Sequence, residues 1–144
     1  MDVRERELVC SVIGSKEAKG ICGSGLFHAI AELRAIGLID RSGRLCRTQH
    51  PLSSRIDGAG TEARFLLVEG EEPIYLTQKD IREFQLAKGA MRAGIELMLE
   101  RAGVKSDDLD HVLVGGAFGS SLRPESLLRV GLLPDESRED RLPG

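Results

Sequence analysis

The amino-acid sequence predicts an α/β domain in which helices pack on a mixed sheet. Two long stretches, residues 26–36 and 81–102, carry apolar residues at helical spacing. Short apolar runs between turn signals are typical of strands. One such run, residues 112–114, is followed directly by Gly115 and Gly116, and glycines just past a strand let a ligand approach the backbone closely. We therefore expect a ligand-binding α/β fold.

The first expected elements are a strand and a helix. Residues 8–13 alternate or run apolar and end at a glycine, which suits a strand. Ser24 is a plausible N-cap for the following helix, and Gly37 stands where a left-handed C-cap belongs. The apolar residues of this helix keep helical spacing: Leu26, Ile30, Leu33 and Ile36. A short strand over residues 38–40 is then expected to run into a turn.

Residues 45–63 form the segment with the weakest pattern, rich in Pro, Ser and Gly, and we expect a mobile loop there. Residues 64–68 and 74–76 follow as two strands joined by a hairpin-like turn. Near the end of the chain, Pro124 is expected to open a helix over residues 125–130.

The longest predicted element is a helix from residue 78 to about residue 102. Thr77 and Asp80 approximate a capping box at its start, and Gly103 should end it. Spacings of three, four or seven residues place six apolar residues on one face, which we interpret as facing the core: Ile81, Phe84, Met91, Ile95, Met98 and Ala102. The two methionines are thus expected to pack rather than to bind a cofactor.

Composition restricts the function classes. The chain of 144 residues, 41% of them hydrophobic, fits one globular domain, here residues 1–135, followed by a charged and flexible tail, residues 136–144. The net charge of −3, interspersed signs and 3% aromatic residues argue against nucleic-acid binding. No apolar stretch is long enough for a bilayer, and the charged start lacks a signal-peptide core, so we expect no membrane contact and a cytoplasmic protein.

Neither the cysteines nor the histidines indicate a metal site. The three cysteines are widely and irregularly spaced and are expected to be free thiols: Cys10, Cys22 and Cys46. The three histidines are equally scattered and are expected at the surface or in helix packing: His28, His50 and His111. A nucleophilic role for Cys22 competes with a small buried thiol, which we favour because no base lies near it in sequence.

Two glycine-rich turns are candidate ligand sites. The first follows residues 112–114 and would contact a nucleotide, although a bare tight turn would have the same sequence: Gly115, Gly116, Ala117, Phe118 and Gly119. The second opens the first helix with Gly23, Ser24 and Gly25, where free N–H groups and the helix dipole could hold a phosphate. It lacks the Lys-Ser/Thr ending of a P-loop, so helix capping alone also explains it.

Several stretches resemble a known family. Val112-Leu113-Val114-Gly115-Gly116, with a proline a few residues on, resembles the adenosine motif of the actin-like ATPases, whose fold is related to ribonuclease H. Three stretches resemble the carboxyl-terminal domain of the reductive activators of corrinoid proteins: Gly20 to Leu26, Leu76 to Ala90, and Gly131 to Asp135. The similarity covers roughly residues 20 to 135.

This resemblance implies an ATP-dependent protein that reduces an inactive Co(II) corrinoid protein to Co(I). It implies ATP or ADP with Mg²⁺ as ligands and makes Gln85 and Lys88 candidates for contact with adenine and ribose, although Lys88 could equally serve only as a solvated helix residue. The family carries a [2Fe-2S] ferredoxin domain near its amino terminus, but its Cys-x4-Cys-x2-Cys pattern is absent here. We therefore expect the cluster only in a part of the parent protein that this chain lacks.

The resemblance also implies that the chain is a portion of the second half of an actin-like ATPase domain. The acidic and glycine-rich hairpins that hold phosphates and Mg²⁺ in this superfamily are not visible. No catalytic base or Mg²⁺ ligand is assigned, and we expect weak or absent nucleotide binding and no catalysis by this chain alone.

Two other classes stay open. A sugar- or acid-kinase-like phosphotransferase shares the adenosine turn, and phosphorylation of a small acceptor without a corrinoid partner would favour it. A binding or assembly module without catalysis is the other alternative. Sheet edges left exposed in a partial domain favour association with further copies, so we expect a homo-oligomer.

Overall fold

The computed structural model describes residues 2–4, 7–12, 14 and 17–133. The predicted tail, residues 136–144, therefore lies outside the described residues, as do the last two residues of the Gly131 to Asp135 stretch. The strands are β1 (Asp2–Arg4), β2 (Glu7–Val9), β3 (Ile56–Asp57), β4 (Arg64–Val68) and β5 (Ile74–Thr77). The α-helices are α1 (Gly23–Ala35), α2 (Gln78–Ala102), α3 (Gly116–Gly119) and α4 (Pro124–Arg129). Three 3-10 helices are η1 (Pro51–Arg55), η2 (Gly60–Glu62) and η3 (Ser106–Asp108).

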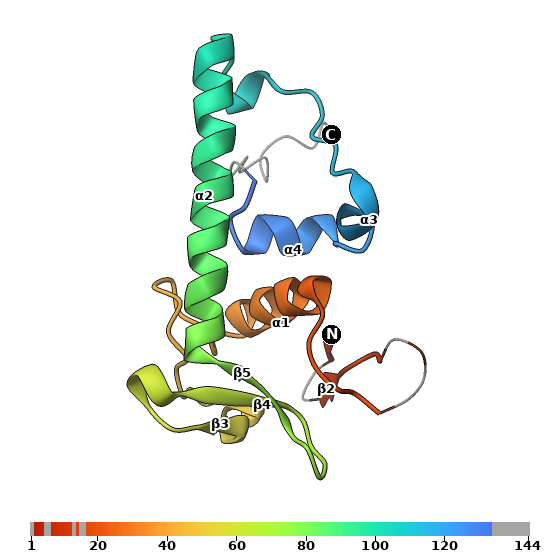
Figure 1. Ribbon diagram of the computed structural model, residues 1–144. Helices are drawn as coiled ribbons and strands as arrows, with labels where there is room; N and C mark the ends of the chain where they lie inside the picture. The colour runs from red at the N-terminus through yellow and green to blue at the C-terminus, as the bar shows by residue number, and fades with distance from the viewer. Residues whose placement is uncertain (1, 5–6, 13, 15–16, 134–144) are drawn as a thin grey trace, which may run out of the picture.

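The main sheet has three antiparallel strands in the order β3-β4-β5, and β1 and β2 form a separate antiparallel pair. Helix α1 lies over the main sheet, α4 packs on α1, and α2 continues directly from β5 and extends well beyond the sheet (Figure 1). The described part of the chain is thus a mixed α/β fold with packed helices, as the sequence predicts.

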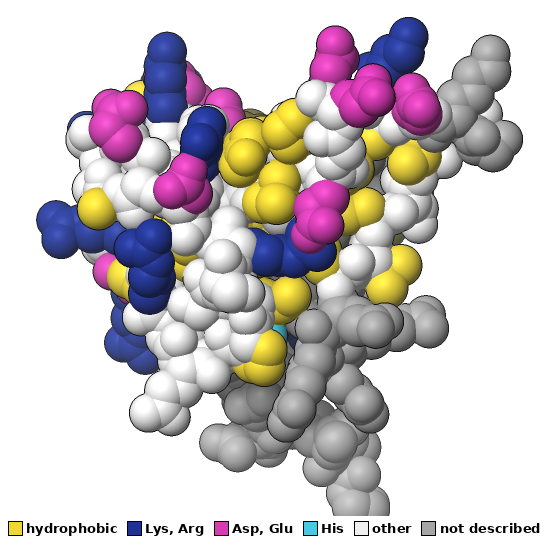
Figure 2. Space-filling model, turned by 90° about the horizontal axis from the view of Figure 1, so that it is seen from below, with side chains coloured by type: hydrophobic (Ala, Val, Ile, Leu, Met, Phe, Trp, Pro, Cys, Tyr) yellow, Lys and Arg dark blue, Asp and Glu magenta, His cyan; other side chains and the backbone are white. Residues whose placement is uncertain are grey.

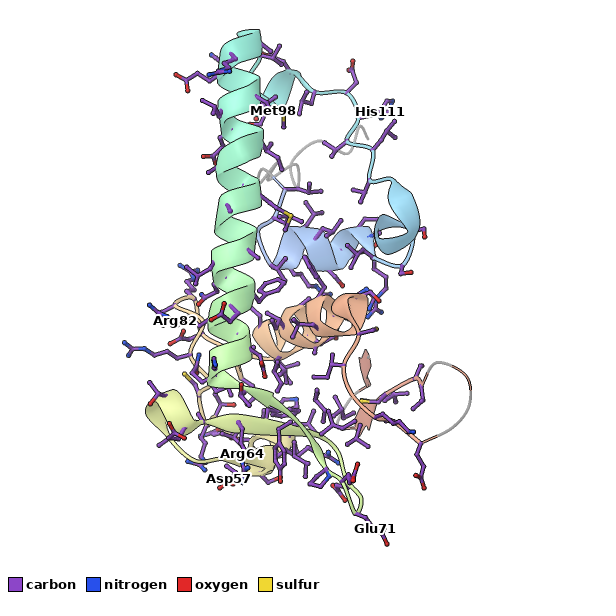
Figure 3. The ribbon with its side chains drawn as sticks, viewed as in Figure 1. Asp57, Arg64, Glu71, Arg82, Met98 and His111 are labelled. Carbon is purple, nitrogen blue, oxygen red and sulfur yellow. The ribbon has the colours of Figure 1, made fainter. Side chains whose placement is uncertain are left out.

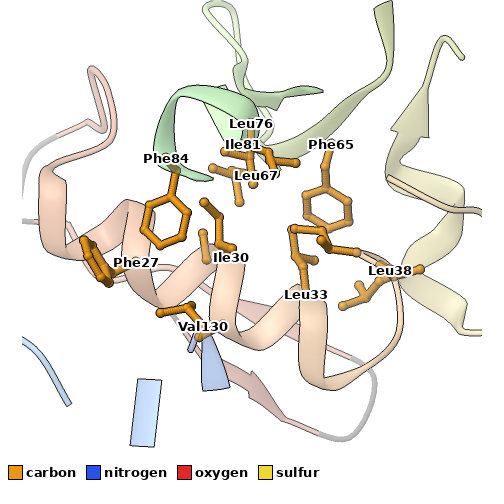
Figure 4. Close-up of a cluster of buried hydrophobic side chains, with 14 of the residues drawn as sticks. Phe27, Ile30, Leu33, Leu38, Phe65, Leu67, Leu76, Ile81, Phe84 and Val130 are labelled. Carbon is orange, nitrogen blue, oxygen red and sulfur yellow. The ribbon is translucent and has the colours of Figure 1, made fainter. Parts of the chain in front are cut away.

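The core lies between α1, the main sheet and the first turns of α2 (Figure 4). Leu33, Phe65 and Leu76 are completely buried, and Ile81 is 1% exposed. The ring of Phe84 meets that of Phe27 edge to face, with centroids 4.7 Å apart. Burial of large apolar side chains at this junction fixes the start of α2 against α1.

The hairpin and the start of α2 confirm the sequence prediction. Strands β4 and β5 pair with Phe65 opposite Leu76. Thr77 caps α2: its hydroxyl accepts a hydrogen bond from Asp80 N–H at 3.1 Å, and the Asp80 carboxylate accepts one from Thr77 N–H at 2.8 Å. Gly103 ends the helix in the left-handed conformation, with φ of 65°. Local side-chain chemistry therefore sets both ends of α2.

The predicted N-cap of α1 was wrong by two residues. Ser24 lies inside the first turn, and Cys22 is the N-cap, with its Sγ accepting a hydrogen bond from Gly25 N–H at 3.3 Å. Sulfur is a weak acceptor, which is why the sequence favoured the serine. Gly37 has φ of 77°, as expected for the left-handed position just past the helix.

The predicted core-facing stripe of α2 was correct for its first turns and, in part, for Ile95, which is half-buried. Ile81 and Phe84 are buried, whereas Met91 and Met98 are 44% and 66% exposed. The physical reason is the length of α2: its second half passes beyond the sheet and α1, where α4 and the segment after α2 lie on one side of it (Figure 1). Ala102 is exposed as well.

Residues 112–114 do not form the predicted buried strand. They have no regular secondary structure, and Val112, Leu113 and Val114 are 48%, 93% and 45% exposed. A strand needs a neighbour that shares its hydrogen bonds. The main sheet lies at the opposite end of α2 (Figure 1), so no described strand is available to pair with this segment.

Three weaker predictions need smaller corrections. In residues 8–13, the described strand β2 ends at Val9. The expected strand at residues 38–40 is reduced to a single bridge between Ile39 and Leu45. Residues 45–63 contain η1, β3 and η2, and the apolar side chains in this segment enter the core: Leu52, Ile56 and Ala63. Their mobility stays a prediction.

The surface carries both signs of charge. The view from below, onto the sheet, shows acidic and basic side chains interspersed with small apolar areas (Figure 2). On this side Arg64 pairs with Asp57 at 2.7 Å and lies over the ring of Tyr75, 4.3 Å from its centroid (Figure 3). Among the described residues, no helix is both long and apolar enough to cross a membrane.

Candidate functional site

The turn predicted to contact adenosine is partly helical, with Gly115 and Gly116 exposed and Gly119 buried. Gly115 precedes α3, and Ser120 N–H donates to the Gly116 carbonyl at 2.9 Å. Gly116 has φ of 89°, a conformation that favours glycine. A Cβ at Gly115 would meet no atom within 4 Å, whereas one at Gly119 would come within 2.9 Å of Val114 Cγ1. The backbone at Gly115 and Gly116 is therefore open to a ligand, while Gly119 is needed for the turn itself.

The second glycine-rich turn begins α1. Gly23 and Ser24 provide N–H groups in the first helical turn, while Gly25 N–H is used by the Cys22 thiol. The Ser24 hydroxyl lies 3.5 Å from Cys22 Sγ, and the hydrogen bonds from Ser24 and Gly25 lower the pKa of this thiol. Cys22 is exposed, so the expectation of a buried thiol was wrong.

The fold brings these two turns to the same end of the molecule. His28, on the second turn of α1, accepts a hydrogen bond through Nε2 from Arg123 N–H at 3.2 Å, just before α4. Helices α1 and α4 pack together, and α3 lies beyond the N-terminal end of α4, on the side where α1 begins (Figure 1). Residues 23–25 and 115–119 are therefore the two candidate stretches that this architecture groups together.

Gln85 and Lys88 lie away from this group. Gln85 Nε2 donates to the Ser42 carbonyl at 3.1 Å, beyond the C-terminal end of α1. Lys88 Nζ donates to the Val130 carbonyl at 3.0 Å, at the end of α4. The length of α1, 13 residues, separates its two ends by about 18 Å. Both side chains thus hold α2 to neighbouring loops, and burial lowers the pKa of Lys88.

Sequence reasoning missed the anchoring role of Gln78. Its amide bridges the turn after α1: Nε2 donates to the Gly43 carbonyl at 2.7 Å, and Oε1 accepts from Leu45 N–H at 2.9 Å. Together with Gln85, this residue fixes the loop after α1 on α2. No sequence signal marks such long-range amide contacts.

A cavity of about 400 Å³ beside the start of α1 was also missed. Its walls come from the segment before α1 and from strands β4 and β5, and include Cys10, Ile21, Cys22, Ala29, Leu67 and Ile74. Cys10 Sγ lies 3.8 Å from the Leu67 carbonyl, and burial raises the pKa of this thiol. The cavity arises from tertiary packing, so the apolar residues of 8–13 were the one local hint of it.

The described residues do not gather metal ligands. Within them, no group of three His, Cys, Asp or Glu side chains could hold a metal ion, and Cys10, Cys22 and Cys46 are free thiols. The residues described here therefore offer no ligand set that fits a [2Fe-2S] cluster.

Comparison with known proteins gives consistent matches. The family model described as the C-terminal domain of RACo, the ASKHA domain, matches residues 1–142. The corrinoid activation enzyme RamQ of Eubacterium limosum is 36% identical over 138 residues, which cover 89% of this chain and 23% of that protein. The Methanosarcina barkeri reductase of the Co(II) methylated amine-specific corrinoid protein is 30% identical over 123 residues, 85% of this chain and 19% of the relative.

A solved structure agrees. The reductive activator for a corrinoid, iron–sulfur protein matches with a TM-score of 0.69 and 36% identity over 81% of this chain and 19% of the other. The chain thus spans about a fifth of the length of these relatives. On its fold, its sequence and the near-complete family match, the chain belongs to the C-terminal ASKHA domains of the reductive activators of corrinoid proteins.

Proposed function

We propose that this chain is part of an ATP-dependent reductive activator of corrinoid proteins and contributes the adenosine side of its nucleotide cleft. The observation that carries the proposal is the family match over residues 1–142, with relatives named as a corrinoid activation enzyme and a Co(II) corrinoid protein reductase. In the proposed reaction, Co(II) accepts one electron and becomes Co(I). The electron comes from a [2Fe-2S] ferredoxin domain outside this chain.

The nucleotide would lie at the turn formed by residues 115–119. The open space at Gly115 and the left-handed backbone of Gly116 support this placement, because a side chain at either position would fill the approach to the backbone. The N–H groups of Gly23 and Ser24, at the same end of the molecule, are the proposed phosphate donors. No Mg²⁺ ligand is assigned among the described residues.

Gln85 and Lys88 fit the proposed adenosine site less well. Each donates its hydrogen bond to a carbonyl of this chain, at Ser42 and Val130. Either side chain would contact a nucleotide only after leaving that carbonyl. We therefore place the main adenosine contact at residues 115–119 and not on α2.

The proposed partner is a corrinoid protein, and we propose neither a nucleic acid nor a membrane as a partner. The balance of 20 basic and 23 acidic residues, and their interspersed signs on the face seen in Figure 2, support the exclusion of nucleic acid, which would require a basic face. We further propose that residues 1–135 form a portion of the second half of the ATPase domain and act in the cytoplasm.

Calorimetric titration of the folded chain with ATP, ADP and adenosine, in the presence of Mg²⁺, tests the proposal. We expect weak affinity for all three, because adenosine contacts dominate, with ATP and ADP binding somewhat more tightly than adenosine through the N–H groups of Gly23 and Ser24. Gly115→Val should abolish binding without backbone strain, since Gly115 has an ordinary φ and open space around it. Gly89→Val, at an exposed position of α2, is the matched control and should bind the three ligands as the unsubstituted chain does.

Retained binding in Gly115→Val together with lost binding in Gly89→Val would overturn the assignment and place the nucleotide on α2. If the folded parent chain gave no heat with any of the three ligands, the claim that this chain carries an adenosine half-site would fail. Circular dichroism spectra of both variants establish that the comparison concerns folded protein.

A further inference from the structure

Helix α2 uses one face to contact the rest of the molecule. The residues of this face follow one another at spacings of four and three and are buried or half-buried: Ile81, Gln85, Lys88, Arg92, Ile95 and Leu99. Besides the hydrogen bonds of Gln85 and Lys88, Arg92 Nη1 donates to the Leu133 carbonyl. The spacing shows a straight contact line along the helix.

The opposite face of α2 is apolar and has no neighbour among the described residues. Leu86 and Leu97 are 62% and 51% exposed, and Ala90 and Ala93 between them are exposed too. These four residues, which we call the back face, lie about 140° around the helix from the contact face. The elements that accompany the distal half of α2 all lie on the other side of it (Figure 1).

The back face is nearly symmetric about its midpoint, between Met91 and Arg92. Leu86 and Leu97 lie at equal distances from this point along the helix, and so do Ala90 and Ala93. Gly89 and Gly94 form a third such pair, and a Cβ at either would meet no atom within 4 Å. A surface with this symmetry is complementary to itself across a twofold axis.

We propose that the back face binds the same face of a second copy of this chain, with the two α2 helices antiparallel. Leu86 then packs against Leu97 of the second copy, and Ala90 against Ala93. The spacing of four, three and four residues is that of a coiled-coil seam, and the alanines and glycines at the crossing let the helix axes approach to about 8 Å. Burial of both leucines in each copy supplies the driving force.

The antiparallel arrangement follows from shape and dipoles. The first turns of α2 contact the sheet and the loop after α1, whereas its distal half extends beyond both (Figure 1). In an antiparallel pair, the end of α2 that carries the sheet in one copy lies beside the distal end of α2 in the other copy. It also opposes the two helix dipoles, which a parallel pair would align. The chain's own tail is a poor alternative, because residues 136–144 are mostly charged with Leu142 as their large apolar residue.

The contact is short, so the dimer should be weak. Leu86 and Leu97 are about 17 Å apart along the helix, and the buried area should fall below the roughly 1,200 Å² of stable complexes. Sedimentation velocity over a wide concentration range should show a shift from monomer to dimer. Leu97→Glu should remain monomeric, whereas Leu128→Glu, an equivalent change at a leucine of α4 that is 49% exposed, should dimerise like the parent chain.

Charge pairing tests the orientation. Leu86→Lys and Leu97→Glu should each be monomeric alone and should dimerise when mixed, because the antiparallel contact brings the introduced lysine of one copy against the introduced glutamate of the other. A mixture that stays monomeric would reject the antiparallel register. A folded parent chain that remains monomeric at every concentration, or equal dimer loss in Leu128→Glu and Leu97→Glu, would overturn the proposal. None of these outcomes depends on nucleotide binding.

Discussion

At the scale of single residues, Asp40 holds the turn after α1. Its Oδ1 accepts hydrogen bonds from Arg44 N–H at 3.0 Å, from Ser42 N–H at 2.8 Å and from the Ser42 hydroxyl at 2.7 Å. These bonds favour the ionised carboxylate and lower the pKa of Asp40 to about 2, with the Arg44 N–H making the largest contribution. This loop places the carbonyls of Ser42 and Gly43 where the side chains of α2 donate to them.

The pH dependence of stability should reveal this carboxylate. Because the folded pKa is lowered, the contribution of Asp40 is fully present above its unfolded pKa, about 3.9, and is lost as the pH falls towards 2. Asp40→Asn should therefore be less stable than the unsubstituted chain at pH 5 to 7, and the difference should shrink steadily as the pH falls from about 4 to about 2. Urea unfolding at each pH measures it, with Asp107→Asn as control. A difference that stayed constant to pH 2 would contradict the prediction.

Gly43 and Gly37 form a matched pair. Both have a left-handed φ, 82° and 77°, but a Cβ at Gly43 would overlap the side-chain amide of Gln85, while one at Gly37 would meet nothing within 4 Å. Gly37→Ala should cost about 1–2 kcal/mol from backbone strain alone. Gly43→Ala should cost about 1 kcal/mol more, because Gln85 must give up its bond to Ser42. If Gly37→Ala and Gly43→Ala lowered the free energy of unfolding in urea by the same amount, the Gln85 contact would contribute nothing.

At the scale of elements, the capping box joins β5 to α2. Thr77→Ala removes the hydroxyl that accepts from Asp80 N–H and should lower the free energy of unfolding by about 1 kcal/mol. Thr77→Ser keeps the acceptor and should recover most of the loss. Thr61→Ala, at an exposed threonine of η2, is the control. Urea denaturation measures all three, and a Thr77→Ser variant as unstable as Thr77→Ala would argue against capping.

The elements that the sequence predicted correctly are those set by local chemistry. Thr77, Asp80 and Gly103 mark the ends of α2 within a few residues of chain, and the β4–β5 hairpin is equally local. Residues 112–114 have a strand-like composition, but a strand also requires a partner, which no local pattern reveals. The prediction that Met91 and Met98 pack in the core was wrong for a related reason. Periodicity identifies a helix face without showing how far the core extends along it.

The candidate site was predictable to a similar degree. The two glycine-rich turns are visible in the sequence, and the fold places both at one end of the molecule. The positions of Gln85 and Lys88 depend on the Ser42 and Val130 carbonyls, which lie more than 40 residues away along the chain. Such contacts, like the cavity beside Cys10 and Cys22, are products of tertiary packing.

At the scale of the whole molecule, burial is concentrated near the sheet. Leu33, with no exposed surface, belongs to this core, whereas Leu113 is 93% exposed. Leu33→Ala should therefore cost about 2–5 kcal/mol, and the chemically identical Leu113→Ala should change stability by less than about 0.5 kcal/mol. Thermal or urea unfolding compares them. A loss above about 1 kcal/mol for Leu113→Ala would mean that this segment is covered in solution.

The capping of α2 by the last residue of β5 has a mechanical consequence. No residue separates strand from helix, so a tilt of the hairpin is passed directly to the start of α2. With 25 residues, α2 extends about 37 Å from Thr77. A tilt of the sheet by about 5° would move Ala102 by about 3 Å, close to the rise of two helical residues. Small adjustments at the core are thereby magnified at the far end of the helix.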